Sequence, residues 1–319
     1  MAGAWKEKVV VIMGSTGTGK SKLSVDIATK FPSEIINSDK MQVYRGLDIA
    51  TNKIPGHERA GVPHHLMDFV EPSGGLGAGE YTELAAQAIS EIAARGRVPI
   101  LVGGSNSYIQ ALVSPDLGPE FRYDCCFIWL DVDLEVLAPY LSRRVDEMMD
   151  AGLLTEMAEF YDPSESVQRG VRLSIGVPEF NRYFLRYPPD SSSESSSCSS
   201  SEEDWDPEEE RRKQMLGEVV DEMKLNTVKL AVKQKSRIEN FRSRGWDIHR
   251  IDATSVFEAA PSQFGHVWEN TVLNPALEIV KKFLSPEAAG LKDSAPSPEA
   301  PQVKEADKVG PAGLTSPVS

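Results

Sequence analysis

A run of glycine, hydroxyl and lysine residues near the start of the chain carries the clearest chemistry. It matches G-x-x-x-x-G-K-[ST] in full and consists of Gly14, Ser15, Thr16, Gly17, Thr18, Gly19, Lys20 and Ser21. Such glycines let successive backbone N–H groups converge on an anion, and the helix that follows adds its positive N-terminal end. Lys20 supplies a point charge, and the Ser21 hydroxyl can hold Mg²⁺. An empty glycine-rich turn is the alternative, but the apolar strand before the run and the helix after it favour a diphosphate or triphosphate site.

Two acidic residues follow predicted strands. Asp39 comes directly after residues 34–38, and the carboxyl ends of parallel strands face the ligand crevice, so it should lie near the phosphate loop. It could accept a proton as a general base or cap a helix, and spacing leaves both roles open. Asp131 ends an apolar strand over residues 125–130. It suits either the metal-supporting acid of a kinase, with Arg143 and Arg144 as a lid, or a cap for the next helix.

The elements that position these residues alternate between strand and helix. Short apolar runs predict strands over residues 9–13, 34–38, 65–70, 98–102 and 125–130, and a late strand over 245–251. Helical spacing predicts helices between them over residues 21–30, 80–95, from 105 onward and over 134–151. This alternation is typical of an α/β fold with a doubly wound parallel sheet, here a P-loop core.

Composition shifts divide the chain. We expect a P-loop core over residues 1–151, a small, mainly helical inserted region over 152–210, a return to the core over 211–284 and a disordered tail over 285–319. Within the inserted region, residues 190–208 form a Ser/Glu-rich loop that cannot bury a core. Its serines are followed by acids, so the loop could be phosphorylated or could be an inert linker.

The overall composition excludes several classes of protein. The chain has 319 residues, of which 40% are hydrophobic, enough for a core. No apolar run is long enough to span a membrane. The three cysteines cannot form a disulfide framework, which fits a reducing compartment. Because the first residues resemble neither a signal peptide nor a transit segment, we expect a cytoplasmic protein, and nothing in the sequence demands more than a monomer.

Charge is unevenly distributed along the chain. The net charge is −14, and residues 190–210 carry −9 of it, whereas residues 211–250 carry +6. The basic segment places Lys229, Lys233 and Arg237 at i, i+4 and i+8, on one helical face. Like charges at this spacing repel, so the face either binds an anionic partner or is simply solvated. The acidic remainder argues against a polynucleotide surface and favours a small anionic ligand.

Several further motifs, taken together with the phosphate loop, resemble a known family. They are Asn37-Ser38-Asp39-x-x-Gln42-Val43-Tyr44-Arg45-Gly46, His64-His65-Leu66, Val102-Gly103-Gly104-Ser105-Asn106-Ser107-Tyr108-Ile109, Arg144-Val145-Asp146-x-Met148-x-x-x-Gly152-Leu153-Leu154, Arg172-x-Ser174-Ile175-Gly176-Val177-Pro178-Glu179-Phe180 and Asn226-Thr227-x-x-Leu230-Ala231-x-x-Gln234. The pattern resembles the isopentenyltransferases that prenylate adenine, and among them the plant adenylate isopentenyltransferases of cytokinin synthesis.

This resemblance implies a reaction and its substrates. The phosphate loop would hold the diphosphate of dimethylallyl diphosphate with Mg²⁺, and the adenine amine of AMP, ADP or ATP would attack the allylic carbon. Asp39 would orient and deprotonate the amine, and Thr16 would assist at the reaction centre. Lys20 and Ser21, with Mg²⁺, would stabilise the charge that builds on the leaving diphosphate. Arg143 is assigned to the diphosphate, and one arginine of the Arg143–Arg144 pair is expected to pair with a neighbouring acid. The residues assigned to the nucleotide are Ser38, Ser105, Lys229 and Lys233. The basic face to which the two lysines belong could bind the leaving diphosphate instead of the phosphates of the acceptor.

Other functions stay open at this stage. A P-loop small-molecule kinase is one alternative, and a nucleotide-binding protein without chemistry is another. The transfer-RNA dimethylallyltransferases are a third. Eukaryotic members of that group carry a C-terminal C-x-x-C…H zinc finger, whereas this chain ends in a Pro/Ala/Ser-rich segment without cysteine. With the acidic overall charge, this difference favours a free nucleotide over a polynucleotide as acceptor.

Overall fold

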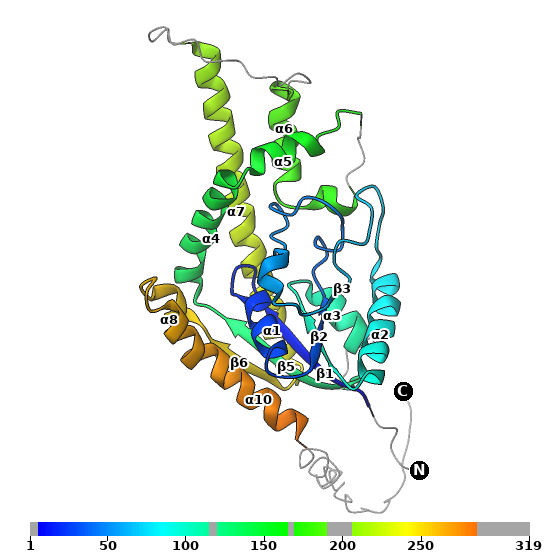
Figure 1. Cartoon of the computed structure of the whole chain (residues 1–319). Coiled ribbons are helices and arrows are strands. Elements are labelled where there is room, and N and C mark those ends of the chain that lie inside the picture. Colours follow the sequence, from blue (N-terminus) through cyan, green and yellow to red (C-terminus); the bar gives the residue numbers. More distant parts are fainter. Residues whose placement is uncertain (1–5, 115–119, 165–168, 190–205, 286–319) are drawn as a thin grey trace, which may run out of the picture. The chain divides into compact units, whose positions relative to one another are not determined.

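A parallel sheet of six strands organises the part of the chain that the computed structural model describes, namely residues 6–114, 120–164, 169–189 and 206–285. Its strands are β1 (Lys8–Gly14), β2 (Ser33–Asn37), β3 (His64–His65), β4 (Val98–Val102), β5 (Asp124–Asp131) and β6 (Ile248–Asp252). They lie in the order β3-β2-β4-β1-β5-β6, and each neighbouring pair is parallel. The chain winds from β1 towards one edge and from β4 towards the other, which confirms the predicted doubly wound α/β fold (Figure 1).

The third strand is shorter than the sequence predicts. β3 has two residues, and the chain leaves it through Leu66 and Asp68, which both adopt the left-handed region with φ of 58° and 55°. That conformation cannot continue a strand. Of the expected strand over residues 65–70, only an isolated bridge between Tyr44 and Val70 follows.

Helices cover both faces of the sheet. Val9, Val11 and Met13 of β1 pack in one core with α2 (Ala78–Ala94), α3 (Asn106–Val113) and the second half of α7 (Pro207–Ser243). Neighbouring side chains in a strand point to opposite faces, so Val10 and Ile12 face the other side. There, α1 (Lys20–Ala28) contacts β1, β2 and β4, and η3 (Glu269–Leu273), a π-helical turn, contacts α1 and β6 before it continues into α10 (Asn274–Leu284).

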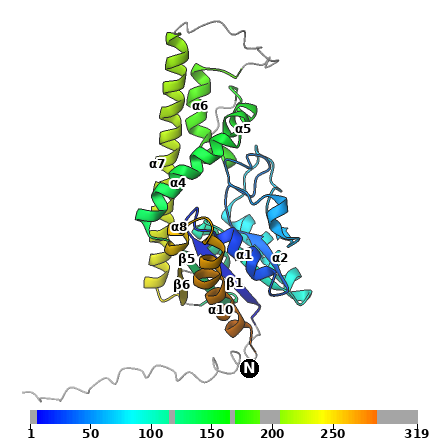
Figure 2. The same ribbon diagram turned by 60° about the vertical axis from the view of Figure 1, so that its left-hand side comes forward.

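A second apolar core lies beyond the carboxyl ends of the strands. It is built by α4 (Leu134–Asp150), α5 (Leu153–Phe160), η2 (Gly170–Leu173), α6 (Val177–Arg186) and the first half of α7, together with Val43, Tyr44 and Leu47 of the segment after β2. α4 and α7 pack against each other and run from the sheet into this helical region (Figure 2). The remaining short elements are η1 (Gly56–Arg59), α8 (Thr254–Glu258) and α9 (Phe264–Trp268).

Two predicted segments fall outside this description. The Ser/Glu-rich loop over residues 190–208 lies outside the described residues except for its last three, where α7 begins with Asp206 as its cap. Residue 285 is the only described residue of the predicted tail over 285–319. Among the described helices, none is both long and apolar enough to cross a membrane.

Candidate active site

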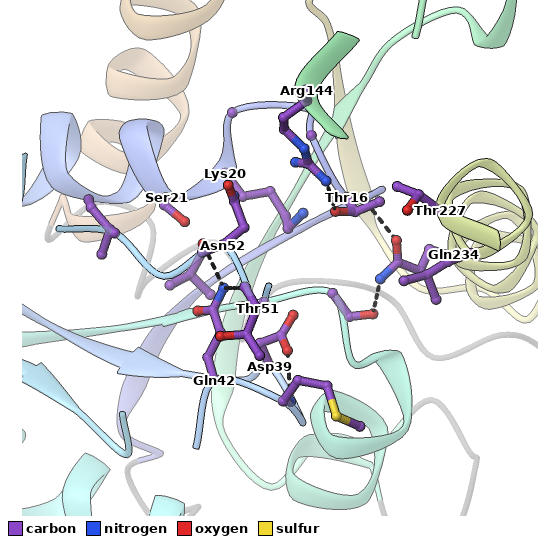
Figure 3. Close-up of a pocket in the computed structure, with 18 of the residues that line it drawn as sticks. Thr16, Lys20, Ser21, Asp39, Gln42, Thr51, Asn52, Arg144, Thr227 and Gln234 are labelled. Carbon is purple, nitrogen blue, oxygen red and sulfur yellow. Dashed lines mark hydrogen bonds between the residues drawn. The ribbon is translucent and has the colours of Figure 1, made fainter. Parts of the chain in front are cut away.

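The ends of β1, β2 and β4 meet at one edge of the sheet and hold the two main candidate segments together. The Ser38 N–H donates to the Val102 carbonyl at 2.7 Å, and the Ser105 N–H donates to the Ser38 carbonyl at 3.1 Å. The approach is so close that a Cβ on Gly103 would lie 2.2 Å from the Ser38 carbonyl. A cavity of about 1080 Å³ opens above this junction, lined by Asp39, Ser105 and the phosphate loop (Figure 3).

The phosphate loop contributes both a surface and a framework. Thr16, Gly17, Gly19, Lys20 and Ser21 line the cavity, and Gly17 and Gly19 have φ of 82° and 93°, which a side chain would disfavour. The other predicted members of the loop are buried beneath it: Gly14, Ser15 and Thr18. The buried Ser15 carbonyl accepts from Lys20 Nζ at 2.6 Å and from Thr18 Oγ1 at 3.0 Å, so it ties the loop together.

Thr16 is held from two helices. Arg144 of α4 donates from Nη2 to Thr16 Oγ1 at 3.1 Å. Gln234 of α7 accepts from the Thr16 N–H at 2.7 Å and donates from Nε2 to the Gly104 carbonyl at 3.0 Å. Gln234 has no predicted role, although it ends the motif over residues 226–234. The side chains of α4 and α7 thus converge on Thr16 of the phosphate loop (Figure 3).

Asp39 combines a structural and a free oxygen. Oδ1 accepts from the Met41 N–H at 2.9 Å, which fixes the turn after β2. Oδ2 has no hydrogen-bond partner among the described residues and lies 3.6 Å from where a Cβ on Gly104 would stand. Of the two roles left open by spacing, the helix cap is wrong, because residues 40–52 form turns and the next helical element is η1. One oxygen holds a turn instead, while the residue borders the cavity, where the other oxygen could accept a proton.

The loop after β2 forms the opposite wall of the cavity. Gln42 Nε2 donates to the carbonyls of Thr51 and Asn52 at 3.0 and 3.2 Å, and all three residues line the cavity. Glu156 of α5 accepts from the N–H groups of Ile49 and Ala50, both at 2.9 Å. The helical region thereby holds the loop after β2 in place, and this loop is a wall of the cavity. The spacing of the motifs did not indicate this connection.

Unpaired positive charge lines the cavity. Burial is the main effect that lowers the pKa of Lys20, to about 8; the nearby Arg144 lowers it further, while Asp39 opposes the shift. Burial also lowers the pKa of Arg144. The expectation that Arg143 or Arg144 pairs with an acid is wrong for the described residues, because no ion pair involves either of them, although both line the cavity. A bound anion would compensate this charge.

The basic face of α7 leads outward from the phosphate loop. Arg237 and Lys233 line the main cavity, whereas Lys229 lines an adjoining cavity of about 490 Å³. Lys233 borders both cavities. Of the other predicted nucleotide residues, Ser105 lines the main cavity and its Oγ accepts from the Lys40 N–H at 2.9 Å, whereas Ser38 is buried beneath it.

Asp131 takes neither of its two predicted roles. Its carboxylate is 2% exposed, accepts from Lys235 Nζ at 3.0 and 3.1 Å and from Arg250 Nε at 2.8 Å, and does not line the cavity. The cap of α4 is instead Asp133, which accepts from the Glu135 N–H at 3.0 Å. Asp131 is therefore a structural acid whose charge is satisfied by its two basic neighbours.

Magnesium would depend largely on the bound phosphates. Among the described residues, no group of three or more His, Cys, Asp or Glu side chains could hold a metal ion. The Ser21 side chain lies beside Lys20 at the cavity (Figure 3). Because Mg²⁺ usually keeps several waters and binds substrate phosphates with few protein ligands, one hydroxyl beside a diphosphate cradle fits this ion.

Comparisons with known proteins point to one family. The family model described as IPP transferase matches residues 42–120 and 114–240. Adenylate isopentenyltransferase 1, chloroplastic, of Arabidopsis thaliana is 46% identical, with 88% of this chain and 82% of the relative covered. Adenylate isopentenyltransferase of Humulus lupulus is 45% identical, with 86% and 89% covered. A eukaryotic dimethylallyltransferase acting on tRNA superposes with a TM-score of 0.70 at 25% identity, covering 90% of this chain and 84% of that one.

The pKa of Lys20 predicts how diphosphate affinity depends on pH. A bound diphosphate favours charged Lys20, so binding is strongest below pH 8, and it weakens by about tenfold per unit as pH rises above 8 and the lysine must take up a proton. Calorimetric titration with pyrophosphate at pH 7 and pH 9 measures this change. The control is Lys20→Arg, whose side chain stays charged at both pH values. Any pH dependence of its affinity comes from the titration of pyrophosphate itself. An identical pH dependence in both proteins would contradict the prediction.

Because Asp131 forms ion pairs away from the cavity, we expect its substitution to lower the stability of the fold without changing pyrophosphate binding. Asp131→Asn removes the charge that Lys235 and Arg250 share, and we expect a loss of about 2 kcal/mol in the free energy of unfolding. Pyrophosphate affinity with Mg²⁺ should stay within about twofold, because the side chain does not reach the cavity. Denaturant unfolding and calorimetry measure the two quantities. A large loss of Mg²⁺-dependent binding in a folded variant would restore the metal-supporting role.

Proposed function

The chain belongs to the isopentenyltransferase family of prenyltransferases, and we propose that it transfers a dimethylallyl group to the exocyclic amine of adenine in AMP, ADP or ATP. The donor is dimethylallyl diphosphate, and the products are pyrophosphate and an isopentenyladenine nucleotide, a cytokinin precursor. One observation carries the proposal. Asp39, whose Oδ2 has no hydrogen-bond partner within the described parts of the chain, borders the same cavity as the phosphate loop, and in those parts neither Lys20 nor the neighbouring Arg144 forms an ion pair.

Each bond change has a group beside it. The amine nitrogen bonds to the first carbon of the donor while the bond from that carbon to the diphosphate oxygen breaks, and pyrophosphate leaves with the electron pair. Asp39 Oδ2 takes the proton that the nitrogen loses. Lys20, Arg144 and the N–H groups at the start of α1 face charge that grows on the leaving group, so they stabilise the transition state more than the ground state.

Thr16 connects the two halves of the reaction. Its hydroxyl accepts from Arg144 and keeps its own proton, which it can donate to the leaving oxygen. Gln234 fixes its backbone, so the hydroxyl is held in place before substrates bind. Mg²⁺ on Ser21 and the donor phosphates would add charge stabilisation to the leaving pyrophosphate.

The basic face of α7 suits the phosphates of the acceptor. Arg237 and Lys233 border the main cavity, and Lys229 borders the adjoining one, so a nucleotide with its base at Asp39 could extend its phosphate chain along them. Like charges at this helical spacing favour an anionic ligand between them. The proposed partners are therefore small molecules, with no polynucleotide, in a monomer. We also propose a cytoplasmic protein, although the Arabidopsis relative is named as chloroplastic.

Two alternatives have weaker support. A kinase would use the acid at the end of β5 for its metal, but Asp131 is neutralised by Lys235 and Arg250. The tRNA-directed enzyme shares the fold, yet the present chain carries −14 net charge, which opposes a polynucleotide. The two named relatives that are 45–46% identical are both adenylate enzymes.

One incubation tests the proposed reaction. With dimethylallyl diphosphate, Mg²⁺ and AMP, ADP or ATP, mass spectrometry should find a five-carbon adduct on the nucleotide. Asp39→Asn should lower its rate of formation by about 10²- to 10⁴-fold while pyrophosphate binding persists, since only the proton acceptor is lost. Phosphorylation of an acceptor without any adduct would refute prenyl transfer. Full activity of Asp39→Asn would remove Asp39 from the base role alone.

The position of the lysines predicts their effect on acceptor preference. Lys229→Ala and Lys233→Ala should raise the KM for ATP by about tenfold and that for AMP by much less, because AMP lacks the β- and γ-phosphates that would reach them. Lys224→Ala is the matched control, since Lys224 is on the same helix but pairs with Asp146 at 2.6 Å and lines neither cavity. Equal losses for ATP and AMP would instead assign the two lysines to the donor or to structure.

A further inference from the structure

The main cavity extends past the phosphate loop to a side that the proposed reaction does not use. Asp39 and the basic face of α7, where the proposed acceptor would bind, lie on one side of the loop. On the other side, the cavity is lined by aromatic side chains of three elements: Tyr140 of α4, Phe257 of α8, and Phe264 and Trp268 of α9. We define these four residues as the aromatic end of the cavity. A five-carbon chain directed at Asp39 leaves it empty.

The aromatic end is built onto the phosphate loop itself. A Cβ on Gly19 would lie 3.0 Å from Cη2 and Cζ3 of Trp268, so the indole ring covers the start of α1. Trp268 Nε1 donates to Asp26 Oδ2 at 2.7 Å, and Lys22 Nζ lies 5.2 Å from the centroid of the ring. The indole is therefore fixed to the same helix whose first N–H groups face the diphosphate.

The remaining rings offer open faces beside this anchor. Phe264 lies nearly parallel to Trp268, with centroids 6.2 Å apart and 10° between the planes, and it is 40% exposed. Tyr140 and Phe257 meet edge to face at 4.8 Å. An aromatic ring that is exposed at the mouth of a cavity has not found its full apolar contact within the fold, and a flat ligand could supply that contact.

The chemistry of the two neighbouring parts defines a ligand class. The phosphate loop with Lys20 and Ser21 takes two linked phosphates, and Arg143 borders the same cavity. Aromatic side chains stack on nucleobases with little preference among them, because every base has a π-face. A molecule with a flat ring at one end and a diphosphate at the other joins these features without reaching Asp39.

We propose that the aromatic end binds the base of a nucleoside diphosphate or triphosphate whose terminal phosphates occupy the phosphate loop, in place of dimethylallyl diphosphate. In this orientation the base points away from Asp39, so no group is transferred, and the nucleotide competes with the prenyl donor. The enzyme would then be slowed by abundant nucleotide independently of acceptor binding. This inference does not rest on which nucleotide is the acceptor.

Inosine 5′-diphosphate tests the proposal, because it has no exocyclic amine and cannot be prenylated. Calorimetric titration with Mg²⁺ should show binding that pyrophosphate abolishes, since both need the phosphate loop. Phe264→Ala and Tyr140→Leu should each weaken the affinity for inosine diphosphate by about tenfold or more. The affinity for pyrophosphate should stay within about twofold. Lys229→Ala should leave inosine diphosphate binding unchanged, because it lines only the adjoining cavity on the α7 side.

The outcomes separate this proposal from the proposed function. The site is supported if at least one aromatic variant selectively loses inosine diphosphate binding. It is overturned if neither variant does. Absence of binding at millimolar nucleotide, or simultaneous binding of pyrophosphate and inosine diphosphate, also overturns it. A loss in Lys229→Ala equal to that in Phe264→Ala would place the nucleotide in the acceptor site instead. None of these results decides whether a prenylated adenine nucleotide forms, because the incubation with dimethylallyl diphosphate measures that separately.

Discussion

Positive charge without a protein counter-charge is the constraint on which the site depends. Lys20 and Arg144 are held where burial lowers the pKa of each, and neither forms an ion pair among the described residues. A fold tolerates such charge only if a ligand or water compensates it. The sheet provides the place, because the ends of β1, β2 and β4 meet there, and the helix dipole of α1 adds to the same field. The site therefore favours a bound anion, whichever anion that is.

α7 ties the phosphate loop to the rest of the cavity. The Ala231 carbonyl accepts from Ser15 Oγ at 2.8 Å, and Gln234 bridges Thr16 and Gly104. Further along the helix, Lys235 neutralises Asp131. One helix thus fixes the loop, removes from the cavity the acid on which a kinase would depend, and presents a basic face towards the proposed acceptor. A carboxylate free to hold metal at β5 would favour phosphoryl transfer. Because Asp131 is paired away from the cavity, the acid that acts electrostatically on Lys20 is Asp39.

The fold and the centre of the site were predictable because both follow from local rules. Apolar runs alternating with helical spacing predicted the doubly wound sheet, and the spacing of the phosphate loop placed Lys20 and Ser21. The partners of Thr16 were not predictable in this way. Gln234 is 218 residues away along the chain, and only the packing of α7 against β1 brings its amide to the loop. Asp131 was misassigned for the same reason, since Lys235 and Arg250 are distant in sequence.

The helical region shows why a site on a sheet edge needs support from elsewhere. The segment after β2 contains Leu47 and Asn52 at positive φ, and such a backbone persists only if its surroundings hold it. Glu156 accepts from two of its N–H groups, and Lys53, whose side chain is 2% exposed, pairs with Asp48 at 2.7 Å. These contacts hold this wall of the cavity in one conformation. Two substrates that must meet in line need such a rigid wall, because effective molarity falls steeply when the reacting atoms are displaced.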